Sequence, residues 1–274
     1  MEKVVGLWLN TGKPEAQAFS LQIEQWFAER DWRVLTQWQD NVEKKVEFLI
    51  SLGGDGTFLQ AAREGAVFGI PVLGVNLGKL GFLCEIERNE VFSALEKVLK
   101  QEFVIQERLM LSALVRKAGE AEQSYLVLND VVFFRDETES MITLQASLSG
   151  EPAISYPADG LIVSTPTGST AYALSSGGPI ISPNVQAILL TPLAAHSLSA
   201  RPVVVSETEE IEVIMESGKQ CQITFDGENK IRIRPEDSVL IKTAPLKAQL
   251  IRLGSRSFPQ VVREKLRDRW HDYE

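Results

Sequence analysis

The stretch that decides the fold is Phe48-Leu49-Ile50-Ser51-Leu52-Gly53-Gly54-Asp55-Gly56-Thr57. Its first half is a short apolar run, which predicts a buried strand, and the run stops abruptly at the glycines. Helical periodicity follows to about Gly65. A strand, a tight turn and a helix in this order are typical of a parallel sheet wound with helices.

The same alternation continues on both sides of this stretch. Pro14 opens a segment in which Phe19, Ile23, Trp26 and Phe27 share one helix face, so we expect that stripe in the core. Residues 1–100 are therefore predicted to form an α/β domain with a parallel sheet. Its remaining elements are expected at Val4–Leu9, Trp32–Leu35 and Ile70–Val75 (strands) and at Val91–Leu99 (helix).

Residues 101–253 read as strand after strand, with one possible short helix near Thr170–Ser175. This pattern predicts an all-β domain, a sandwich of two sheets. The expected strands are Met110–Val115, Tyr125–Phe134, Ile142–Leu148, Leu161–Ser164, Val203–Val205, Glu212–Met215, Ile223–Phe225, Ile231–Ile233, Val239–Thr243 and Gln249–Leu253.

The tail, residues 254–274, changes character again. Val262, Leu266 and Trp270 are spaced by four in a charged background, which predicts an amphipathic helix over Pro259–Trp270. We expect this helix to pack back on the first domain.

Composition narrows the class of protein. Of the 274 residues, 44% are apolar and 24% charged, which excludes intrinsic disorder, collagen and a disulfide-stapled miniprotein. The net charge of −9 argues against nucleic acid as partner, although backbone amides could still hold a small phosphate ligand. The N-terminus reads as a strand, and no apolar run is long enough to span a membrane. Cys84 and Cys221 lie far apart, so we expect no metal site and a reducing, cytoplasmic setting.

The Gly53–Thr57 turn is a candidate ligand site. Its three glycines let the backbone approach a ligand closely, and the amides of the following helix start suit phosphate. Asp55 stands at the carboxyl end of a parallel strand, where open α/β sheets bind ligands. No Gly-Lys-Ser/Thr follows, so the turn is not a Walker A loop. The alternative is a plain connecting turn capped by Asp55.

A second glycine cluster, Gly74, Gly78 and Gly81, follows the Ile70–Val75 strand. Its spacing misses the dinucleotide G-x-G-x-x-G pattern, and by itself a plain loop explains it. Two glycine turns at one sheet edge would, however, form a phosphate cradle.

Two polar stretches of the β domain are candidates for nucleotide binding. Asp159-Gly160 leads through a buried strand into Ser164–Tyr172, followed by Gly177-Gly178-Pro179. Hydroxyls with one aromatic ring suit hydrogen bonding and base stacking, and a polar surface loop is the alternative. Asn129-Asp130 ends a buried run; Asn reads adenine edges well, but such a pair is more often a turn.

Together, Gly53–Thr57, Asn76–Leu83, Asn129-Asp130, Asp159–Tyr172 and Gly177-Gly178-Pro179 closely resemble the NAD kinase family over nearly the whole chain. Thr165–Tyr172 is the specific part. Gly53–Thr57 alone is shared with diacylglycerol-type lipid kinases and resembles a phosphofructokinase turn. The resemblance implies a Rossmann-like α/β domain followed by a β sandwich.

The resemblance also implies transfer of the γ-phosphoryl group of ATP to the 2′-hydroxyl of the adenosine ribose of NAD, which gives NADP. Asp55 matches the catalytic acid residue that accepts the hydroxyl proton. The implied NAD-binding residues are Asp55, Gly56, Asn129, Asp130, Asp159, Thr170, Ala171, Tyr172, Ala173, Leu174, Ser175, Ala194 and Glu228. The implied donor-binding residues are Gly53, Gly54, Gly56, Thr57, Asn76 and Gly78.

The resemblance further implies a divalent cation, with Mg²⁺ carried in by ATP, and a homodimer or homotetramer. Two positions depart from the common pattern: Pro157 replaces an Arg near the nicotinamide side, and Glu228 replaces a Gln. Whether polyphosphate replaces ATP, and whether NADH is accepted, stays open. Two alternatives are a lipid or other small-molecule kinase and a non-catalytic dinucleotide-binding regulator. Thr165–Tyr172 and Asn129-Asp130 disfavour the first alternative, and Asp55 in its glycine setting disfavours the second.

Overall fold

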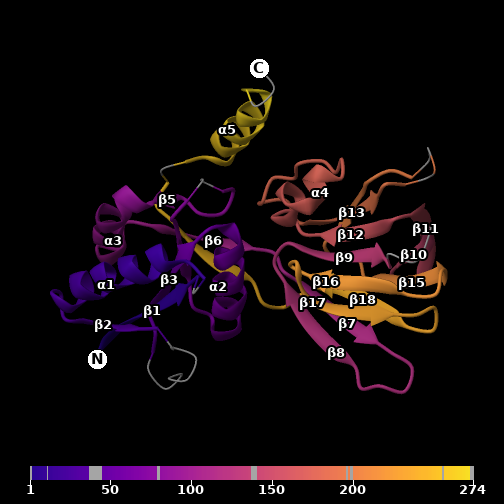
Figure 1. The fold of residues 1–274 in the computed structure, drawn as a ribbon, viewed down its shortest axis with the longest axis horizontal. Coiled ribbons are helices and arrows are strands. Elements are labelled where there is room, and N and C mark those ends of the chain that lie inside the picture. Colours follow the sequence, from indigo (N-terminus) through magenta and orange to yellow (C-terminus); the bar gives the residue numbers. More distant parts are fainter. Residues whose placement is uncertain are drawn as a thin grey trace. The chain divides into compact units, whose positions relative to one another are not determined.

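The computed structural model describes residues 2–10, 12–36, 45–78, 81–136, 141–195, 197, 200–254 and 256–271, without the side chains of 267–271. The chain folds into two compact units (Figure 1). The first unit, which we call the α/β unit, combines Met1–Glu107 with Ala248–Glu274. The second, the β unit, is Arg108–Lys247. Each unit is described by itself.

The α/β unit is built on one sheet of seven strands with the order β2-β1-β3-β4-β19-β6, to which β5 adds by pairing with β4. The pairs among β1, β2, β3, β4, β5 and β19 are parallel, which confirms the predicted α/β domain. The strands are β1 (Lys3–Leu9), β2 (Trp32–Leu35), β3 (Phe48–Gly53), β4 (Val72–Asn76), β5 (Ile86–Glu87), β6 (Val104–Arg108) and β19 (Ala248–Arg252). The helices are α1 (Pro14–Ala28), α2 (Asp55–Phe68), the 3₁₀ turn η2 (Arg88–Glu90), α3 (Val91–Leu99) and α5 (Phe258–His271).

Helix α1 shows why the sequence folds locally as it does. Pro14 stands at its first turn, where a missing N–H costs nothing. Phe19, Ile23 and Phe27 are fully buried against the sheet, and Trp26 is half-buried, which confirms the predicted core stripe.

The strand order creates a switch point in the sheet. From β1 the chain turns to β2 on one side, and β3 and β4 then add on the other side. The carboxyl ends of β1 and β3 therefore lie next to each other, with Leu9 opposite Leu52. Such a point is where open α/β sheets bind ligands, because the loops diverge there and leave a crevice.

The β unit is a sandwich of two six-stranded antiparallel sheets, as predicted (Figure 1). One sheet has the order β11 (Glu151–Ala158), β10 (Ile142–Leu148), β15 (Ile211–Ser217), β18 (Ser238–Thr243), β7 (Leu111–Arg116), β8 (Gln123–Val127). The other has the order β14 (Val203–Ser206), β13 (Ala187–Leu193), β12 (Gly160–Ser164), β9 (Asp130–Arg135), β16 (Cys221–Phe225), β17 (Glu228–Ile233). Alternate residues of strands from both sheets form a single apolar core. The 3₁₀ turn η3 (Gly168–Thr170) and α4 (Tyr172–Ser175) follow β12, close to the predicted short helix.

Three details differ from the sequence-based expectations. Tyr125–Phe134 is two strands, because the chain breaks at Leu128-Asn129 and passes from one sheet of the sandwich to the other. The strand expected at Gln249–Leu253 in the β domain is β19, which pairs with β4 in the sheet of the α/β unit. Strands β5, β6, β11 and β13 are not among the predicted ones. Helix α5 lies where the tail helix was predicted; its packing on the first domain stays a prediction.

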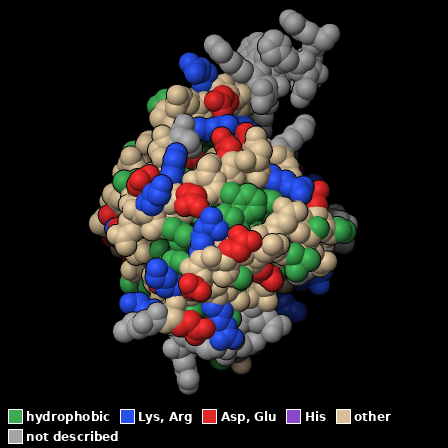
Figure 2. Space-filling view, turned by 90° about the vertical axis from the view of Figure 1, so that its left-hand side faces the viewer, with side chains coloured by type: hydrophobic (Ala, Val, Ile, Leu, Met, Phe, Trp, Pro, Cys, Tyr) green, Lys and Arg blue, Asp and Glu red, His purple; other side chains and the backbone are tan. Residues whose placement is uncertain are grey.

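The surface seen in Figure 2 carries basic and acidic side chains interspersed, with no large field of one sign. Among the residues that the structure describes, none of the helices is long and apolar enough to cross a membrane. Both cysteines are buried and unpaired.

Candidate active site

Asp55 is the first residue of α2 and follows β3 directly. Its carboxylate accepts hydrogen bonds from the backbone N–H groups of Phe82 (2.7 Å), Leu83 (3.2 Å) and Cys84 (3.3 Å). A Cβ atom at Gly81 would overlap this carboxylate, so the close approach requires glycine there. Asp55 thus joins the first glycine turn to the segment that follows β4.

The two glycine turns lie at the same sheet edge, as predicted. Gly53 is opposite Asn76 in the β3–β4 register, and the Leu77 N–H donates to the Gly53 carbonyl at 3.1 Å. The buried Asn76 side chain accepts the Gly78 N–H at 3.0 Å, and its Nδ2 has no hydrogen-bond partner in the described part of the chain. Lys79 and Leu80, which complete the second turn, lie outside the described residues.

A buried ion pair supports the segment that holds Asp55. The Arg252 guanidinium donates from Nη1 to the Leu83 carbonyl at 2.8 Å and lies 3.8 Å from the Glu85 carboxylate. Its Nε donates to Gln106 at 3.1 Å. Burial lowers the pKa of Arg252, and the Glu85 carboxylate opposes that shift. Burial, followed by the neighbouring Asp55 charge, raises the pKa of the Cys84 thiol well above its usual range, so the thiol stays protonated.

The glycine side of the first turn faces a cavity of about 470 Å³, which we call the switch-point cavity. Of the predicted donor-binding residues, Gly54, Gly56 and Thr57 line it, while Asn76 and Gly78 are not among its lining residues. Gly53 instead packs against the Thr57 side chain, with which a Cβ would overlap. Leu9, Asn10, Lys13 and Gln60 complete the lining and were not predicted. In the sequence, Asn10 was the available signal for this part of the lining, because it directly follows β1 as Gly54 directly follows β3.

In the β unit, Asn129 is the last residue of the break between β8 and β9, and Asp130 is the first residue of β9. The Asp226 carboxylate accepts the N–H groups of Leu128 (2.9 Å), Asn129 (2.7 Å) and Asp130 (3.2 Å). Thr165, which is fully buried, donates its hydroxyl to the Leu128 carbonyl at 2.6 Å and accepts the Gly168 N–H at 3.0 Å. The predicted Asn129-Asp130 and Thr165–Tyr172 segments therefore meet. The buried Asn129 Oδ1 has no hydrogen-bond partner among the described residues, which leaves it available to a ligand.

Asp130 is 5% exposed, and its environment suppresses ionisation. Burial, with a contribution from the Asp226 charge, raises its pKa to about 7. A carboxyl group near half-protonation at neutral pH can donate as well as accept a hydrogen bond.

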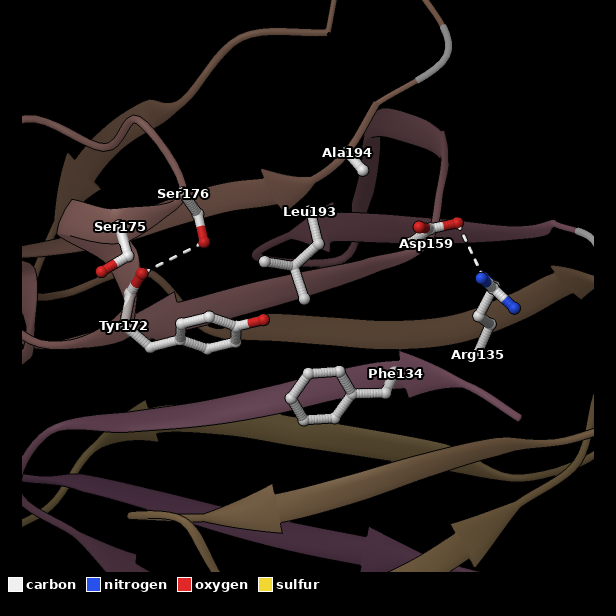
Figure 3. Close-up of a pocket in the computed structure, with 8 residues that line it drawn as sticks. All are labelled: Phe134, Arg135, Asp159, Tyr172, Ser175, Ser176, Leu193 and Ala194. Carbon is white, nitrogen blue, oxygen red and sulfur yellow. Dashed lines mark hydrogen bonds and ion pairs between the residues drawn. The ribbon is translucent and has the colours of Figure 1, made fainter. Parts of the chain in front are cut away.

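A second cavity, of about 440 Å³, lies in the β unit and is drawn in Figure 3. It gathers Asp159, Tyr172, Ser175 and Ala194, which come from separate stretches of the chain and were all predicted. The Arg135 Nε donates to the Asp159 carboxylate at 2.8 Å. The ring of the exposed Tyr172 lies 5.9 Å from that of Phe134, and both rings face the cavity (Figure 3).

Four lining residues of this cavity were missed: Phe134, Arg135, Ser176 and Leu193. The signal for Phe134 was the alternation of β9, which places it on the face opposite the buried Phe133.

Several predicted NAD-binding residues are not lining residues of this cavity. Ala173 is fully buried in an apolar cluster with Val132 and Ile162, so its side chain faces the interior. The Thr170 hydroxyl donates to the Thr167 carbonyl at 3.0 Å, which caps its own turn. The remaining ones of the β unit are Ala171, Leu174, Glu228, Asn129 and Asp130, and Asp55 and Gly56 belong to the α/β unit.

The described part of the chain holds no group of three or more His, Cys, Asp or Glu side chains that could bind a metal ion. A divalent cation at these sites would take its other ligands from a bound phosphate compound.

Comparison with known proteins gives consistent matches. A family model described as the ATP-NAD kinase N-terminal domain matches residues 5–103, and the ATP-NAD kinase C-terminal domain model matches residues 128–253. The NAD kinase of Heliobacterium modesticaldum is 41% identical over 276 residues, which cover 96% of this chain and 98% of that protein. The NAD kinase of Moorella thermoacetica is 40% identical over 278 residues, which cover 96% and 89%.

Solved structures share the fold. A yeast NADH kinase complexed with NADH matches with a TM-score of 0.87 at 22% identity and covers 96% of this chain and 87% of that one. An Archaeoglobus fulgidus NAD kinase in complex with ATP matches with a TM-score of 0.76 at 23% identity and covers 94% and 98%.

Proposed function

Since the chain belongs to the NAD kinase family, we propose that it moves the γ-phosphoryl group of ATP to the adenosine 2′-hydroxyl of NAD, with Asp55 as proton acceptor. The membership confirms the prediction of a kinase of this family over the lipid-kinase and regulator alternatives. NADP and ADP are the products.

In the proposed step, the 2′-oxygen of NAD bonds to the γ-phosphorus as the bond from that phosphorus to the β-bridging oxygen breaks. The hydroxyl proton passes to Asp55. Phosphoryl transfer has a loose transition state, so the base needs to act only late and an ordinary carboxylate suffices. Alignment then supplies most of the acceleration.

The placement of Asp55 is the observation that carries this proposal. Three backbone amides fix its carboxylate at the carboxyl end of β3, so the group is preorganised. A carboxylate oxygen has two acceptor positions, and the Asp55 Oδ2 accepts one backbone amide. The substrate hydroxyl would take the other position.

We assign the dinucleotide to the β-unit cavity and to the Asn129-Asp130 break. A volume of about 440 Å³ is in the range of small-molecule sites, and Tyr172 offers an aromatic face to a planar ring. Arg135 and Asp159 supply paired charges at the same cavity. The unpartnered Asn129 Oδ1 and the partly protonated Asp130 would read hydrogen-bonding groups of the adenosine.

ATP would enter as its magnesium complex, so the cation belongs to the substrate. Bound to the phosphates, it would neutralise charge on the group being transferred. The homodimer or homotetramer is a further part of the proposal and rests on the family resemblance. The cytoplasmic location is another part, and it rests on the two unpaired cysteines, Cys84 and Cys221.

Asp55→Asn tests the proposal, because the amide keeps the shape of the side chain but cannot take a proton. We expect kcat for NADP formation to fall by about 10²–10⁴, with NAD binding retained in calorimetry. Unfolding by urea checks that the fold survives. Near-normal turnover in this variant would exclude Asp55 as the base.

A further inference from the structure

On the premise of the function proposed above, we propose that Asp226 is a positioning residue for the dinucleotide. Its carboxylate fixes the backbone of Leu128–Asp130 and thereby aims the side chains of this segment at the ligand. The resemblance that names Asn129 and Asp130 for NAD binding assigns no role to Asp226. In the sequence Asp226 lies 96 positions beyond Asp130, and the fold brings the two together.

Asp226 and Thr165 satisfy the backbone polar groups of all three residues of the segment. The three N–H groups donate to the Asp226 carboxylate, at 2.9 Å from Leu128, 2.7 Å from Asn129 and 3.2 Å from Asp130. In return the Asp226 N–H donates to the Asp130 carbonyl at 2.9 Å. Thr165 donates its hydroxyl to the Leu128 carbonyl at 2.6 Å and its N–H to the Asn129 carbonyl at 2.9 Å. The backbone of the segment is therefore held from both sides, with one ionised acceptor on three donors.

Side-chain groups at this segment are left for a ligand. The buried Asn129 Oδ1 has no hydrogen-bond partner among the described residues. Ser164 stands opposite Asp130 in the β12–β9 register, and its buried hydroxyl likewise has no partner in the described part of the chain. Because buried polar groups are ordinarily hydrogen-bonded, two such groups beside one fixed segment indicate a ligand that supplies the missing partners.

The turn that carries Asp226 does not by itself require a carboxylate. Phe225 pairs with Glu228, so Asp226 and Gly227 form the two-residue turn of the β16–β17 hairpin. Both have positive φ, +51° and +77°, which is the type I′ pattern. Asn, Asp and Gly all suit the first position of such a turn. Of these three residues, Asp alone brings a charged acceptor with two oxygens.

The Asp226 carboxylate also opposes ionisation of Asp130. Burial, followed by the Asp226 charge, raises the pKa of Asp130 to about 7. Strand β12 and residues 165–171, which lie beside Asp130, carry no ionisable side chain. The other ionisable groups on the elements around this segment are Arg108, Tyr125, Arg135, Tyr172, Cys221 and Glu228. Removal of the Asp226 charge should therefore lower the pKa of Asp130.

Asp226→Asn and Asp226→Gly in the full-length enzyme are the first test, because both residues keep the turn. Loss of hydrogen bonds to a charged acceptor frees the segment, so KM for NAD should rise about tenfold or more. KM for ATP should stay within about twofold and kcat at saturating NAD within about threefold, as expected when ground-state binding is lost. Unchanged KM for NAD in both variants, or an equal rise in both KM values, would overturn the proposal.

Asp237→Asn is the matched control. Asp237 is also a buried carboxylate of the β unit that holds backbone amides, since it accepts the N–H groups of Ala118 at 3.1 Å and Arg234 at 2.8 Å. It is not a residue of the segment or of the β-unit cavity. Urea unfolding should show a stability loss in Asp237→Asn as in Asp226→Asn, whereas KM for NAD should stay at the wild-type value. A rise in KM for NAD in the control would attribute the effect to general destabilisation and exclude positioning by Asp226.

The pH profile of kcat/KM for NAD distinguishes positioning from a merely structural role, because it reports the pKa values of the free enzyme. The wild-type profile should change with a midpoint near pH 7, where Asp130 titrates. Asp226→Asn should move that midpoint to lower pH, and Asp130→Asn should remove it. A raised KM with the midpoint unmoved would make Asp226 a structural residue only and overturn the proposal.

Calorimetric titration of NAD in the absence of ATP separates this proposal from the kinase function. Asp226→Asn should bind NAD about tenfold or more weakly than the wild type and Asp237→Asn. If the wild type bound NAD but formed no NADP, the proposed reaction would fail while this comparison still tested Asp226. If Asp226→Asn bound NAD as tightly as the wild type and both formed NADP, the positioning role would fail and the kinase function would stand.

Discussion

The buried carboxyl group of Asp130 lies beside the Asp226 carboxylate, which also accepts the Asp130 backbone N–H at 3.2 Å. One carboxylate thus fixes the backbone of the β8–β9 break and at the same time opposes ionisation of the next carboxyl group. This relationship makes stability depend on pH in a defined direction.

Asp130→Asn should reveal that dependence. The pKa of Asp130 is about 7 in the folded chain and near 4 when unfolded, so the folded state binds more protons between these values. The free energy of unfolding of the wild type should therefore fall as pH rises from about 4 to 7, and Asn removes this loss. We expect the free energy of unfolding of the variant, measured with urea, to rise relative to that of the wild type as the pH increases from 5 to 8.

The control for this prediction is Glu151→Gln, which changes an exposed carboxylate on β11. Its effect should not vary with pH. If the free energies of unfolding of Asp130→Asn and the wild type differed by a constant amount over this pH range, the raised pKa of Asp130 would be contradicted.

Gly81→Ala should displace the Asp55 carboxylate. The new Cβ would overlap Asp55, so we expect a stability loss of about 1–3 kcal/mol from overpacking and a kcat loss of about 10²-fold from misplacement. Gly78→Ala is the stability control, because its Cβ would meet nothing within 4 Å.

A double-mutant cycle identifies the cause of the Gly81→Ala effect. In an Asp55→Ala background the clash is gone, so Gly81→Ala should cost much less stability than in the wild type. Equal costs in both backgrounds would show that the overlap with Asp55 is not the reason.

Arg252→Met should strongly destabilise the α/β unit. It removes the cation beside the Glu85 carboxylate, of which 6% of the side chain is exposed, and it removes the donor to the Leu83 carbonyl. Breaking a buried pair costs about 3–5 kcal/mol, and we expect thermal and urea unfolding to report it. The control is Arg116→Met, which breaks the exposed ion pair between Arg116 on β7 and Glu122. It should lower the free energy of unfolding by less than about 1 kcal/mol.

Activity gives a second measure of Arg252. Because the Leu83 and Cys84 amides hold Asp55, the surviving fraction of Arg252→Met should show reduced kcat with nearly unchanged KM for ATP. Arg252→Lys should recover stability in part. If Arg252→Met were as stable as Arg116→Met, the supporting role of the Arg252–Glu85 ion pair would be refuted.

The sequence predicted what depends on local pattern. The apolar run before Gly53 and the periodicity after it were sufficient for β3 and α2, and with them for the position of Asp55. Residue pattern marked Asp159 and Tyr172 only as parts of polar stretches, and Ala194 could be named only through the family resemblance. The three residues meet at one cavity from the β11–β12 connection, from the start of α4 and from the end of β13, and periodicity carries no such information.

What the sequence missed depends on contacts between distant segments. The break at Leu128-Asn129 exists because Asp226, 98 positions beyond Leu128, accepts its N–H; a continuous apolar run hides such a break. Lys13 was overlooked because nothing local marks it, and only the β1–β3 pairing brings it to the glycine turn.

Strand β19 has a consequence for the order in which the molecule is assembled. The central sheet of the α/β unit places β19 between β4 and β6, although some 170 residues separate β4 from β19 along the chain. During synthesis from the N-terminus, every residue of the β unit therefore emerges before that sheet can close. The inserted sandwich is continuous in sequence and the domain around it is not. We therefore expect the sandwich to mature first and the turn that carries Asp55 to gain its full support last.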